Sequence, residues 1–359
     1  MKKIAVVDPA SYALTYDYQY IKSLADIYHV DFYCSSTKYN YDYIEKISNL
    51  SNVEVIEYKV SNVNKILGLF NLIRLYFDIF MSFKSYSSIN IQWSVFPFVE
   101  IPIYVLLQSK LVYTFHNSKP HNCKNDTTIS NRLISRLSKI NLFVSEYTKK
   151  VFESNYNAKS KKSFILNHGI MPLTDRKISF SELNSYDNSQ IKLVFWGNIK
   201  PYKGVDFLLN SVPSLKGENI SLQVYGKYDD DLLYIHEELI KNNVISNNGY
   251  LPLYEIEKIL LEQSNLLVLP YKNSSQSGIM YNCLALGVPF ISSNTGEAAQ
   301  FLKKYDLTGL IFDYGDVESL LESINYYKKN QFEVIKVFES LKNEYSWSYD
   351  HNYLREIFE

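Results

Sequence analysis

Cysteine, proline and glycine are scarce in this sequence of 359 residues, which contains 3 Cys, 10 Pro and 12 Gly. The three cysteines (Cys34, Cys123 and Cys283) are too widely and irregularly spaced to form a disulfide framework or a metal-binding motif. We therefore predict no metal site. Glycine and proline are too few for collagen or a low-complexity chain, and no heptad repeat indicates a coiled coil. What is left is a globular protein, whose length predicts two domains.

An excess of charge is lacking as well. The sequence has 37 Lys and Arg against 38 Asp and Glu, which gives a formal net charge of -1. Proteins that bind nucleic acids usually depend on an excess of positive charge, so we expect no nucleic-acid partner.

The sequence also lacks a long uninterrupted apolar run, and its N-terminus has too short an apolar core for a signal peptide. The most apolar stretch, from Ile66 to Phe83, contains Asn71, Arg74 and Asp78. A charge in the middle of a spanning helix costs about 2.5–3.5 kcal/mol. We therefore interpret this stretch as a buried amphipathic helix of a cytoplasmic protein. Peripheral contact with the inner face of the cytoplasmic membrane is the alternative.

Aromatic residues are abundant, since 32 Tyr, 20 Phe and 3 Trp make up 15% of the chain. An AT-rich genome would enrich tyrosine without any functional reason. Aromatic side chains that stack on sugar rings are the functional interpretation, and composition does not distinguish the two.

Short apolar runs alternate with segments of helical periodicity, without hairpin signals between them. This order predicts βαβ units and parallel sheets of the α/β class, covered on both faces. In the first half, helices are predicted near 17–28, 40–50, 63–83, 98–108, 127–139 and 146–155. The predicted strands are Lys3–Val7, His29–Tyr33, Val53–Tyr58, Ile89–Trp93, Leu111–Phe115, Leu142–Ser145, and then Ile191–Trp196, Ser221–Tyr225, Asn265–Pro270, Val288–Ser292 and Gly309–Phe312.

A polar stretch without periodicity separates the two halves. We predict a first Rossmann-like domain over residues 1–170, a linker over 171–190 and a second Rossmann-like domain over 191–340. Ligands of open α/β sheets bind beyond the carboxyl ends of the strands, so we expect the site in a cleft between two facing sheets.

The first informative segment follows the strand that ends near Trp196. It contains Gly197, Asn198, Lys200 and Lys203, and Gly204 opens the next helix. Backbone N–H groups at a helix start attract anions, and the two lysines add positive charge. An ordinary strand–helix turn with two solvated lysines is the alternative.

The second informative segment follows the strand that ends near Pro270. Its small and polar residues Ser274, Gln276, Ser277 and Gly278 precede a helix that carries Asn282. Consecutive amides and hydroxyls at this helix start form a second candidate anion site. Helix capping alone would also explain such a turn, but two anion sites in one domain suit a diphosphate.

Together the two segments resemble the nucleotide-binding half of the family 4 glycosyltransferases, which have the GT-B fold. The resemblance extends to the first half, where the segments are Leu111–His121, Ser145–Lys150 and Asn167–Gly169. The stretch Tyr345–Trp347 is similar to the family's closing helix, which implies that a C-terminal helix over 341–359 crosses back to the first domain.

The resemblance implies that Lys203 contacts the diphosphate of the donor. Asn198 stands in place of the family's arginine, and Lys200 could supply the missing charge. Ser274 and Asn282 stand in place of its two glutamates, as in a Ser/Thr-Gln-Ser-Gly variant subgroup of bacterial members. An Asn can still hydrogen-bond a ribose hydroxyl.

His116 matches a histidine that contacts the donor sugar in the family, although a histidine at a strand end is often structural. Tyr250 and Leu251 are expected near the base. On the acceptor side the candidates are Ser11, Tyr12, Tyr16, Asn117 and His121, and the tyrosines could equally be packing residues. The acids Asp8, Asp17 and Asp126 could also face the acceptor, but nothing identifies one of them as a general base.

The resemblance implies a retaining, metal-independent transfer of one sugar from a nucleoside diphosphate sugar, with no other cofactor. The expected acceptor is a glycan or a lipid-linked oligosaccharide in surface polysaccharide synthesis. The alternatives are a GT-B nucleotide-sugar epimerase and an inactive glycosyltransferase-like partner subunit.

Overall fold

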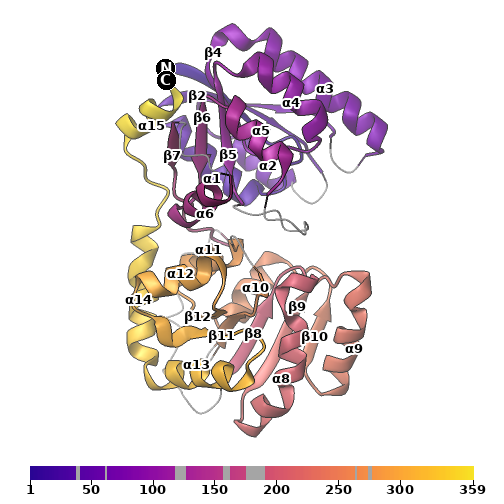
Figure 1. Ribbon diagram of the computed structural model, residues 1–359, viewed down its shortest axis with the longest axis vertical. Helices are drawn as coiled ribbons and strands as arrows, with labels where there is room; N and C mark the ends of the chain where they lie inside the picture. The colour runs from indigo at the N-terminus through magenta and orange to yellow at the C-terminus, as the bar shows by residue number, and fades with distance from the viewer. Residues whose placement is uncertain are drawn as a thin grey trace. The chain divides into compact units, whose positions relative to one another are not determined.

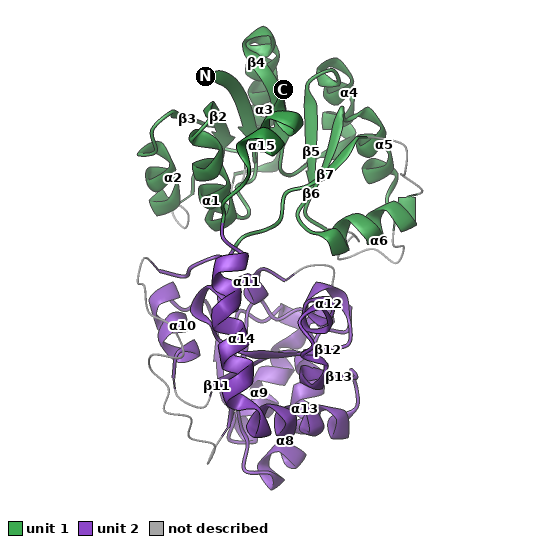
Figure 2. Cartoon of the chain, turned by 90° about the vertical axis from the view of Figure 1, so that its left-hand side faces the viewer, with its two compact units in different colours: residues 1–169, 347–359 green, residues 170–346 purple. Residues whose placement is uncertain are grey.

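The computed structural model of the protein describes residues 1–37, 41–60, 63–117, 127–156, 162–174, 191–262, 265–273 and 277–359. The chain divides into two compact units, shown in green and purple in Figure 2. Unit 1 comprises Met1–Gly169 and Trp347–Glu359, and unit 2 comprises Ile170–Ser346.

The C-terminal part of the chain differs from the single helix predicted over 341–359. Helix α14 (Gln331–Glu344) belongs to unit 2, and the chain returns to unit 1 at Trp347, where α15 (His351–Phe358) follows. The two helices are separate because Asp350 caps a new helix, accepting a hydrogen bond from the backbone N–H of Tyr353.

Unit 1 is built on a seven-stranded parallel sheet in the order β3-β2-β1-β4-β5-β6-β7 (Figure 1). The chain folds this way because each strand is an apolar run and each crossover carries a helix. Strand order reverses between β1 and β4, so loops leave the sheet in opposite directions there. The strands are β1 (Lys2–Val7), β2 (Tyr28–Cys34), β3 (Val53–Glu57), β4 (Tyr86–Ile91), β5 (Leu111–Phe115), β6 (Ile140–Phe143) and β7 (Ser163–Ile165). The helices are α1 (Leu14–Ala25), α2 (Tyr41–Ser48), α3 (Lys65–Met81), α4 (Pro97–Leu107), α5 (Ile129–Leu137) and α6 (Glu146–Tyr156).

Unit 2 is built on a six-stranded parallel sheet in the order β10-β9-β8-β11-β12-β13, with its reversal between β8 and β11. The strands are β8 (Lys192–Trp196), β9 (Ser221–Gly226), β10 (Ile245–Asn248), β11 (Asn265–Leu269), β12 (Phe290–Ser293) and β13 (Ile311–Phe312). Besides α14, the helices are α8 (Val205–Gly217), α9 (Leu233–Lys241), α10 (Leu253–Leu260), α11 (Gly278–Leu286), α12 (Gly296–Lys304) and α13 (Val317–Lys329).

Helix α3 corrects the prediction of a buried amphipathic helix over 66–83. Its residues Leu72, Leu75, Tyr76 and Ile79 are buried, but the opposite side of the helix is both apolar and exposed. Among the residues that the structure describes, no helix combines the length and the apolar character that a membrane span requires.

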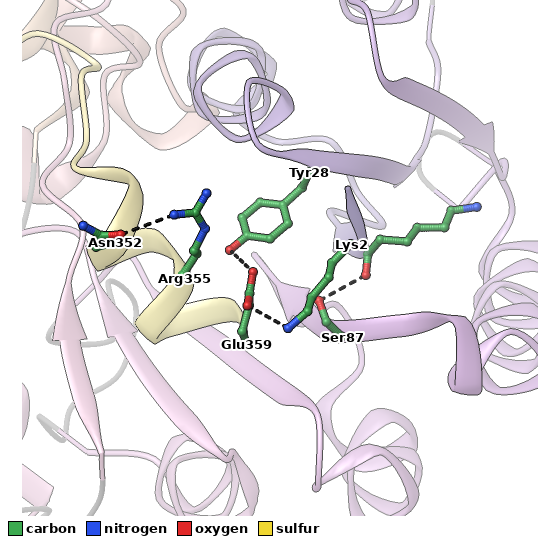
Figure 3. A network of polar contacts seen from close by, with 7 residues as sticks. Lys2, Tyr28, Ser87, Asn352, Arg355 and Glu359 are labelled. Carbon is green, nitrogen blue, oxygen red and sulfur yellow. Dashed lines mark hydrogen bonds and ion pairs between the residues drawn. The ribbon is translucent and has the colours of Figure 1, made fainter.

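The C-terminal segment completes unit 1. Figure 3 shows the carboxylate of Glu359 beside the first two strands, where one oxygen lies 2.7 Å from Lys2 Nζ and the other accepts a 3.5 Å hydrogen bond from the Tyr28 hydroxyl. Leu354, Ile357 and Phe358 of α15 are buried. Trp347 lies so close to Gly169 that a Cβ there would be 2.6 Å from the indole Nε1.

We expect Gly169→Ala to destabilise unit 1 by about 1–3 kcal/mol, because the added methyl must displace the packed indole of Trp347. Urea unfolding followed by tryptophan fluorescence measures the loss. The matched control is Gly217→Ala, where a Cβ meets no atom within 4 Å, and it should cost no stability. An equal effect of the two substitutions would contradict the packing of Trp347 on Gly169.

Candidate functional site

Two loops of unit 2 meet at the carboxyl edge of its sheet, beside the reversal of strand order. Gly204 follows β8 with a φ of 72°, and a Cβ on it would lie 1.8 Å from the carbonyl oxygen of Pro270, which follows β11. The backbone N–H of Lys272 donates a 2.9 Å hydrogen bond to the Tyr202 carbonyl. The structure therefore brings the two predicted segments together, and a side chain at position 204 would separate them.

Lys203 is linked to the start of α11 through Tyr271. The Lys203 ammonium lies 4.1 Å from the centroid of the buried Tyr271 ring, and the Tyr271 hydroxyl is 3.0 Å from Ser277 Oγ. Ser277 is the N-cap residue of α11, and Gly278 is its first residue. Burial lowers the pKa of Lys203, but the neighbouring Tyr271 and Tyr202 outweigh this effect and the pKa is raised. Tyr271 thus joins a charged ammonium to a helix N-terminus, and both are features that favour anions. We call these three residues the Lys203–Tyr271–Ser277 assembly.

The other residues predicted to bind the donor differ in exposure and location. Asn198 is exposed, and Gly197 has a φ of 131°. Lys200 lines a separate cavity of about 90 Å³ together with Asp206, Tyr234 and Lys272. Tyr250 is exposed and Leu251 half-buried, both directly after β10 at the carboxyl edge. Ser274 and Gln276 lie outside the described residues.

Asn282 is buried, and its amide nitrogen is used within unit 2. Asn282 Nδ2 donates a 2.7 Å hydrogen bond to the carbonyl of Met171, whose own N–H donates to the carbonyl of Tyr281. These bonds fix the first residues of unit 2 on α11. One N–H of Asn282 is thus used within unit 2, and the predicted ribose contact would use its amide oxygen or its second N–H.

His116 lies at the carboxyl end of β5 in unit 1 and is 5% exposed. Trp93 stacks on its ring, with centroids 4.3 Å apart and planes at 9°. The ring Nε2 is 2.9 Å from Gln92 Oε1. Because the Gln92 amide nitrogen donates to Asn90, its oxygen faces the histidine, and His116 donates through Nε2. Burial, and next the proximity of His168, lower the pKa of His116 to about 3, so the ring is neutral at pH 7.

Asp8 and Asp17 form a buried carboxyl pair after β1. The Asp8 carboxylate accepts hydrogen bonds from the backbone N–H groups of Ala10, Ser11 and Tyr12. Neither oxygen of Asp17 accepts a hydrogen bond from a residue that the structure describes. Burial raises the pKa of Asp17 well above its usual value, and the charge of Asp8 raises it further. Asp17 therefore keeps its proton to a higher pH than an exposed Asp does, while Asp8 shapes the loop.

The acceptor-side candidates divide into exposed and buried residues. Tyr12 is exposed and meets Trp93 edge-on, and Asn117 is half-buried directly after His116. The Ser11 hydroxyl is held within the loop, donating to the Asp8 carbonyl and accepting from a backbone N–H. His121 lies outside the described residues.

Tyr16, for which the sequence left sugar stacking and packing equally open, is buried in unit 1. Helix α1 begins at Leu14, so Tyr16 lies in its first turn and points into unit 1. Its ring is 2% exposed, with four aromatic rings within 5.6 Å of its centroid. These are the rings of Tyr20, His116, His168 and Trp347. In this structure Tyr16 is a packing residue.

We expect the stability of Asp17→Asn, measured relative to that of the unmodified protein, to increase as the pH rises from 4 to 7. An unfolded Asp ionises near pH 3.9, whereas the folded protein keeps the Asp17 proton to higher pH. Below pH 4 Asp17 is protonated in both the folded and the unfolded state, and its contribution to the free energy of unfolding is complete. As the pH rises, this contribution falls by at most about 1.4 kcal/mol per pH unit. The lowered pKa values of the buried His116 and His168 destabilise the folded protein toward acid pH. This effect is the same in both proteins and cancels in the difference.

Thermal unfolding of both proteins over this pH range measures the difference. The matched control is Asp26→Asn at the exposed C-terminal end of the same helix, which should show no such trend. A stability difference for Asp17→Asn that stays constant from pH 4 to 7 would show that Asp17 ionises equally in both states.

Three side chains at these edges were missed by the sequence analysis. Gln92 and Trp93 were assigned to a strand, but β4 ends at Ile91, and both contact His116. A polar residue near the end of an apolar strand was the available signal. Tyr271, directly after the predicted strand ending at Pro270, joins Lys203 to Ser277. Across the described ranges, no three His, Cys, Asp or Glu side chains are grouped to hold a metal ion.

Residues 175–343 match the family model described as glycosyl transferases group 1. The match lies within unit 2 and covers just under half of the chain. The match covers the predicted donor-side segments, including the Lys203–Tyr271–Ser277 assembly.

Solved structures resemble the whole chain. Sucrose-phosphate synthase from Thermosynechococcus elongatus superposes with a TM-score of 0.70 at 14% identity, covering 100% of this chain and 99% of that one. The Anabaena HepE protein in complex with UDP gives a TM-score of 0.66 at 11% identity, covering 99% and 97%. The lipopolysaccharide outer core galactosyltransferase WaaB gives 0.66 at 12% identity, covering 98% and 97%. These likenesses confirm the predicted GT-B fold of two Rossmann-like α/β domains.

A curated relative is an uncharacterised 41.2 kDa protein from the cps region of Klebsiella pneumoniae. It is 24% identical over 143 residues, which are 39% of this chain and 37% of that protein. The chain thus spans little more than a third of the length of this relative.

Proposed function

We propose that this protein transfers one sugar from a nucleoside diphosphate sugar to a hydroxyl group of a glycan or a lipid-linked oligosaccharide. The observation that carries the proposal is the Lys203–Tyr271–Ser277 assembly, which lies in the part of the chain that matches the glycosyl transferases group 1 model. Its ammonium and helix N-terminus offer positive charge to a diphosphate, without need of a metal ion. The UDP in the related HepE structure supports a nucleotide ligand.

In the proposed reaction the anomeric carbon loses its bond to the diphosphate and gains a bond to the acceptor oxygen on the same face of the sugar. The acceptor proton passes to the departing phosphate oxygen. Lys203 and the first amides of α11 stabilise the charge that develops on the diphosphate. The Asp8 carboxylate already accepts hydrogen bonds from three backbone N–H groups, and we propose phosphate rather than this carboxylate as the proton acceptor.

A glycan acceptor of surface polysaccharide synthesis is supported by two similarities. The curated relative is encoded in a cps region, and WaaB is named as a galactosyltransferase of the lipopolysaccharide outer core. We propose cell-surface carbohydrate assembly as the setting for this protein.

A panel of nucleotide sugars tests the proposal. A true donor at 100 times its dissociation constant should add about 2.7 kcal/mol to the stability of the protein, which a thermal shift assay detects. Nucleotide release that requires an acceptor, with the anomeric configuration of the donor retained in the product by NMR, is the expected result. Interconversion of donors without an acceptor would indicate an epimerase, and donor binding without turnover an inactive partner subunit. Either outcome would overturn the proposal.

A further inference from the structure

Helix α3 has an apolar face that unit 1 leaves uncovered. Ile66, Phe70, Phe77 and Met81 are 84%, 63%, 59% and 68% exposed, although they are among the most hydrophobic side chains of the helix. With Ile73 and Phe80 they recur at the spacing of one helix face, within an arc of about 100° at 3.6 residues per turn. A continuous stripe of this kind marks an interaction site rather than scattered surface apolar residues.

The apolar face continues onto α4 and α5. Tyr76 of α3 donates a 2.8 Å hydrogen bond to Glu100 of α4, and α4 packs against α5. Buried residues on the inner sides of the three helices belong to one core. Figure 1 shows α3, α4 and α5 beside the sheet of unit 1. Their outer sides add further exposed apolar residues, which are Phe98, Val105, Leu106, Ile129 and Leu133. We call the outer sides of α3, α4 and α5 the apolar surface.

The charges of the apolar surface have one sign. The exposed charged residues of the three helices, all of whose residues are described, are Lys65, Arg74, Arg132 and Arg136. The two acidic residues of these helices, Asp78 and Glu100, accept hydrogen bonds within unit 1. The half-buried Asp78 accepts a hydrogen bond from the Tyr58 hydroxyl, and Glu100 is buried between Ser94 and Tyr76.

We propose that the apolar surface docks on an anionic lipid bilayer, with α3 lying in the plane of the membrane interface. Exposed phenylalanines enter the boundary of the acyl chains, while the arginines and Lys65 meet anionic headgroups. A second copy of the chain is a less favourable partner for this surface than a bilayer. A symmetric contact would bring the basic residues of the two copies close together, and like charges repel. The docking does not depend on the proposed sugar transfer. That the docking gives access to a lipid-linked acceptor does rest on the proposed sugar transfer.

Vesicle sedimentation with the full chain tests the docking. Vesicles of equal parts phosphatidylglycerol and phosphatidylcholine should bind the protein more tightly than vesicles of phosphatidylcholine alone. The double variant Phe70→Gln/Phe77→Gln should bind at least about ten-fold more weakly, because two inserted aromatic side chains are lost. The triple variant Lys65→Gln/Arg74→Gln/Arg132→Gln should lose the preference for phosphatidylglycerol. Raising salt from about 0.1 M to 1 M should remove the same preference, since the Debye length falls from about 10 Å to 3 Å.

The matched control is Tyr254→Gln/Phe332→Gln, which removes two equally exposed aromatic residues from unit 2 and should bind like the unmodified protein. Donor turnover with a water-soluble acceptor reports the proposed function separately, and it should be unchanged in all three variants. No binding to the anionic vesicles, or equal loss in the control, would overturn the docking. So would a concentration-dependent dimer in light scattering that Phe70→Gln/Phe77→Gln abolishes.

Discussion

Lys203→Ala should weaken donor binding and slow transfer together, by about 10- to 150-fold in kcat/KM. A charge-assisted contact contributes about 1.5–3 kcal/mol, and this lysine should oppose diphosphate charge in both the ground state and the transition state. The structure supports a charged ammonium, since its position over Tyr271 raises the pKa of Lys203 despite burial. Titration of the free nucleotide diphosphate measures the binding part of the loss, and initial rates measure the remainder.

Two matched variants separate charge from packing in this prediction. Lys203→Met keeps an apolar stem over Tyr271 but removes the charge, and it should lose as much as Lys203→Ala. Lys272→Ala removes a neighbouring lysine that forms a 2.7 Å ion pair with Asp206, and it should change donor binding little. Unchanged kinetics in a folded Lys203 variant would reduce this residue to a surface lysine.

The strands show where sequence reasoning succeeds. Strand β5 has the predicted bounds, Leu111–Phe115, because all five of its side chains are buried and the apolar run marks it. Strands β7 and β10 were not predicted. Strand β7 has three residues, and the Ile-Ser-Asn-Asn sequence of β10 is polar and partly exposed at the edge of its sheet. An edge strand needs no apolar run, so the pattern that identifies central strands is missing.

The candidate site shows a similar division. The loops around Gly204 and Ser277 could be predicted because helix starts and their glycines and hydroxyls are local in sequence. The burial of Tyr16 could not be predicted, because the rings that cover it come from residues as distant as Trp347. The exposure of α3 was missed for the same reason, since helical periodicity gives a face but not what covers it.

His116→Ala should lower turnover by about 10²-fold or more, with a much smaller effect on donor affinity. The resemblance implies that His116 contacts the donor sugar, and a contact that is stronger in the transition state affects kcat more than binding. The ring is neutral, because burial lowers the pKa of His116 to about 3. A ring with so low a pKa is a weak base, so we expect His116 to position the donor or hydrogen-bond to it. The pH–rate profile should then show no step from His116 between pH 5 and 8.

The structure indicates that His116→Ala should also be less stable than the unmodified protein. Removing the ring leaves Gln92 Oε1 buried without its 2.9 Å partner, and such an unpaired group costs about 1–3 kcal/mol. The discriminating variant is therefore His116→Gln, whose amide N–H can still donate to Gln92 while the imidazole is lost. If His116 contacts the donor, His116→Gln should melt close to the unmodified protein and still turn over about 10²-fold more slowly. If His116→Gln keeps its turnover and His116→Ala melts much earlier but is active while folded, His116 is a structural partner of Gln92 and Trp93.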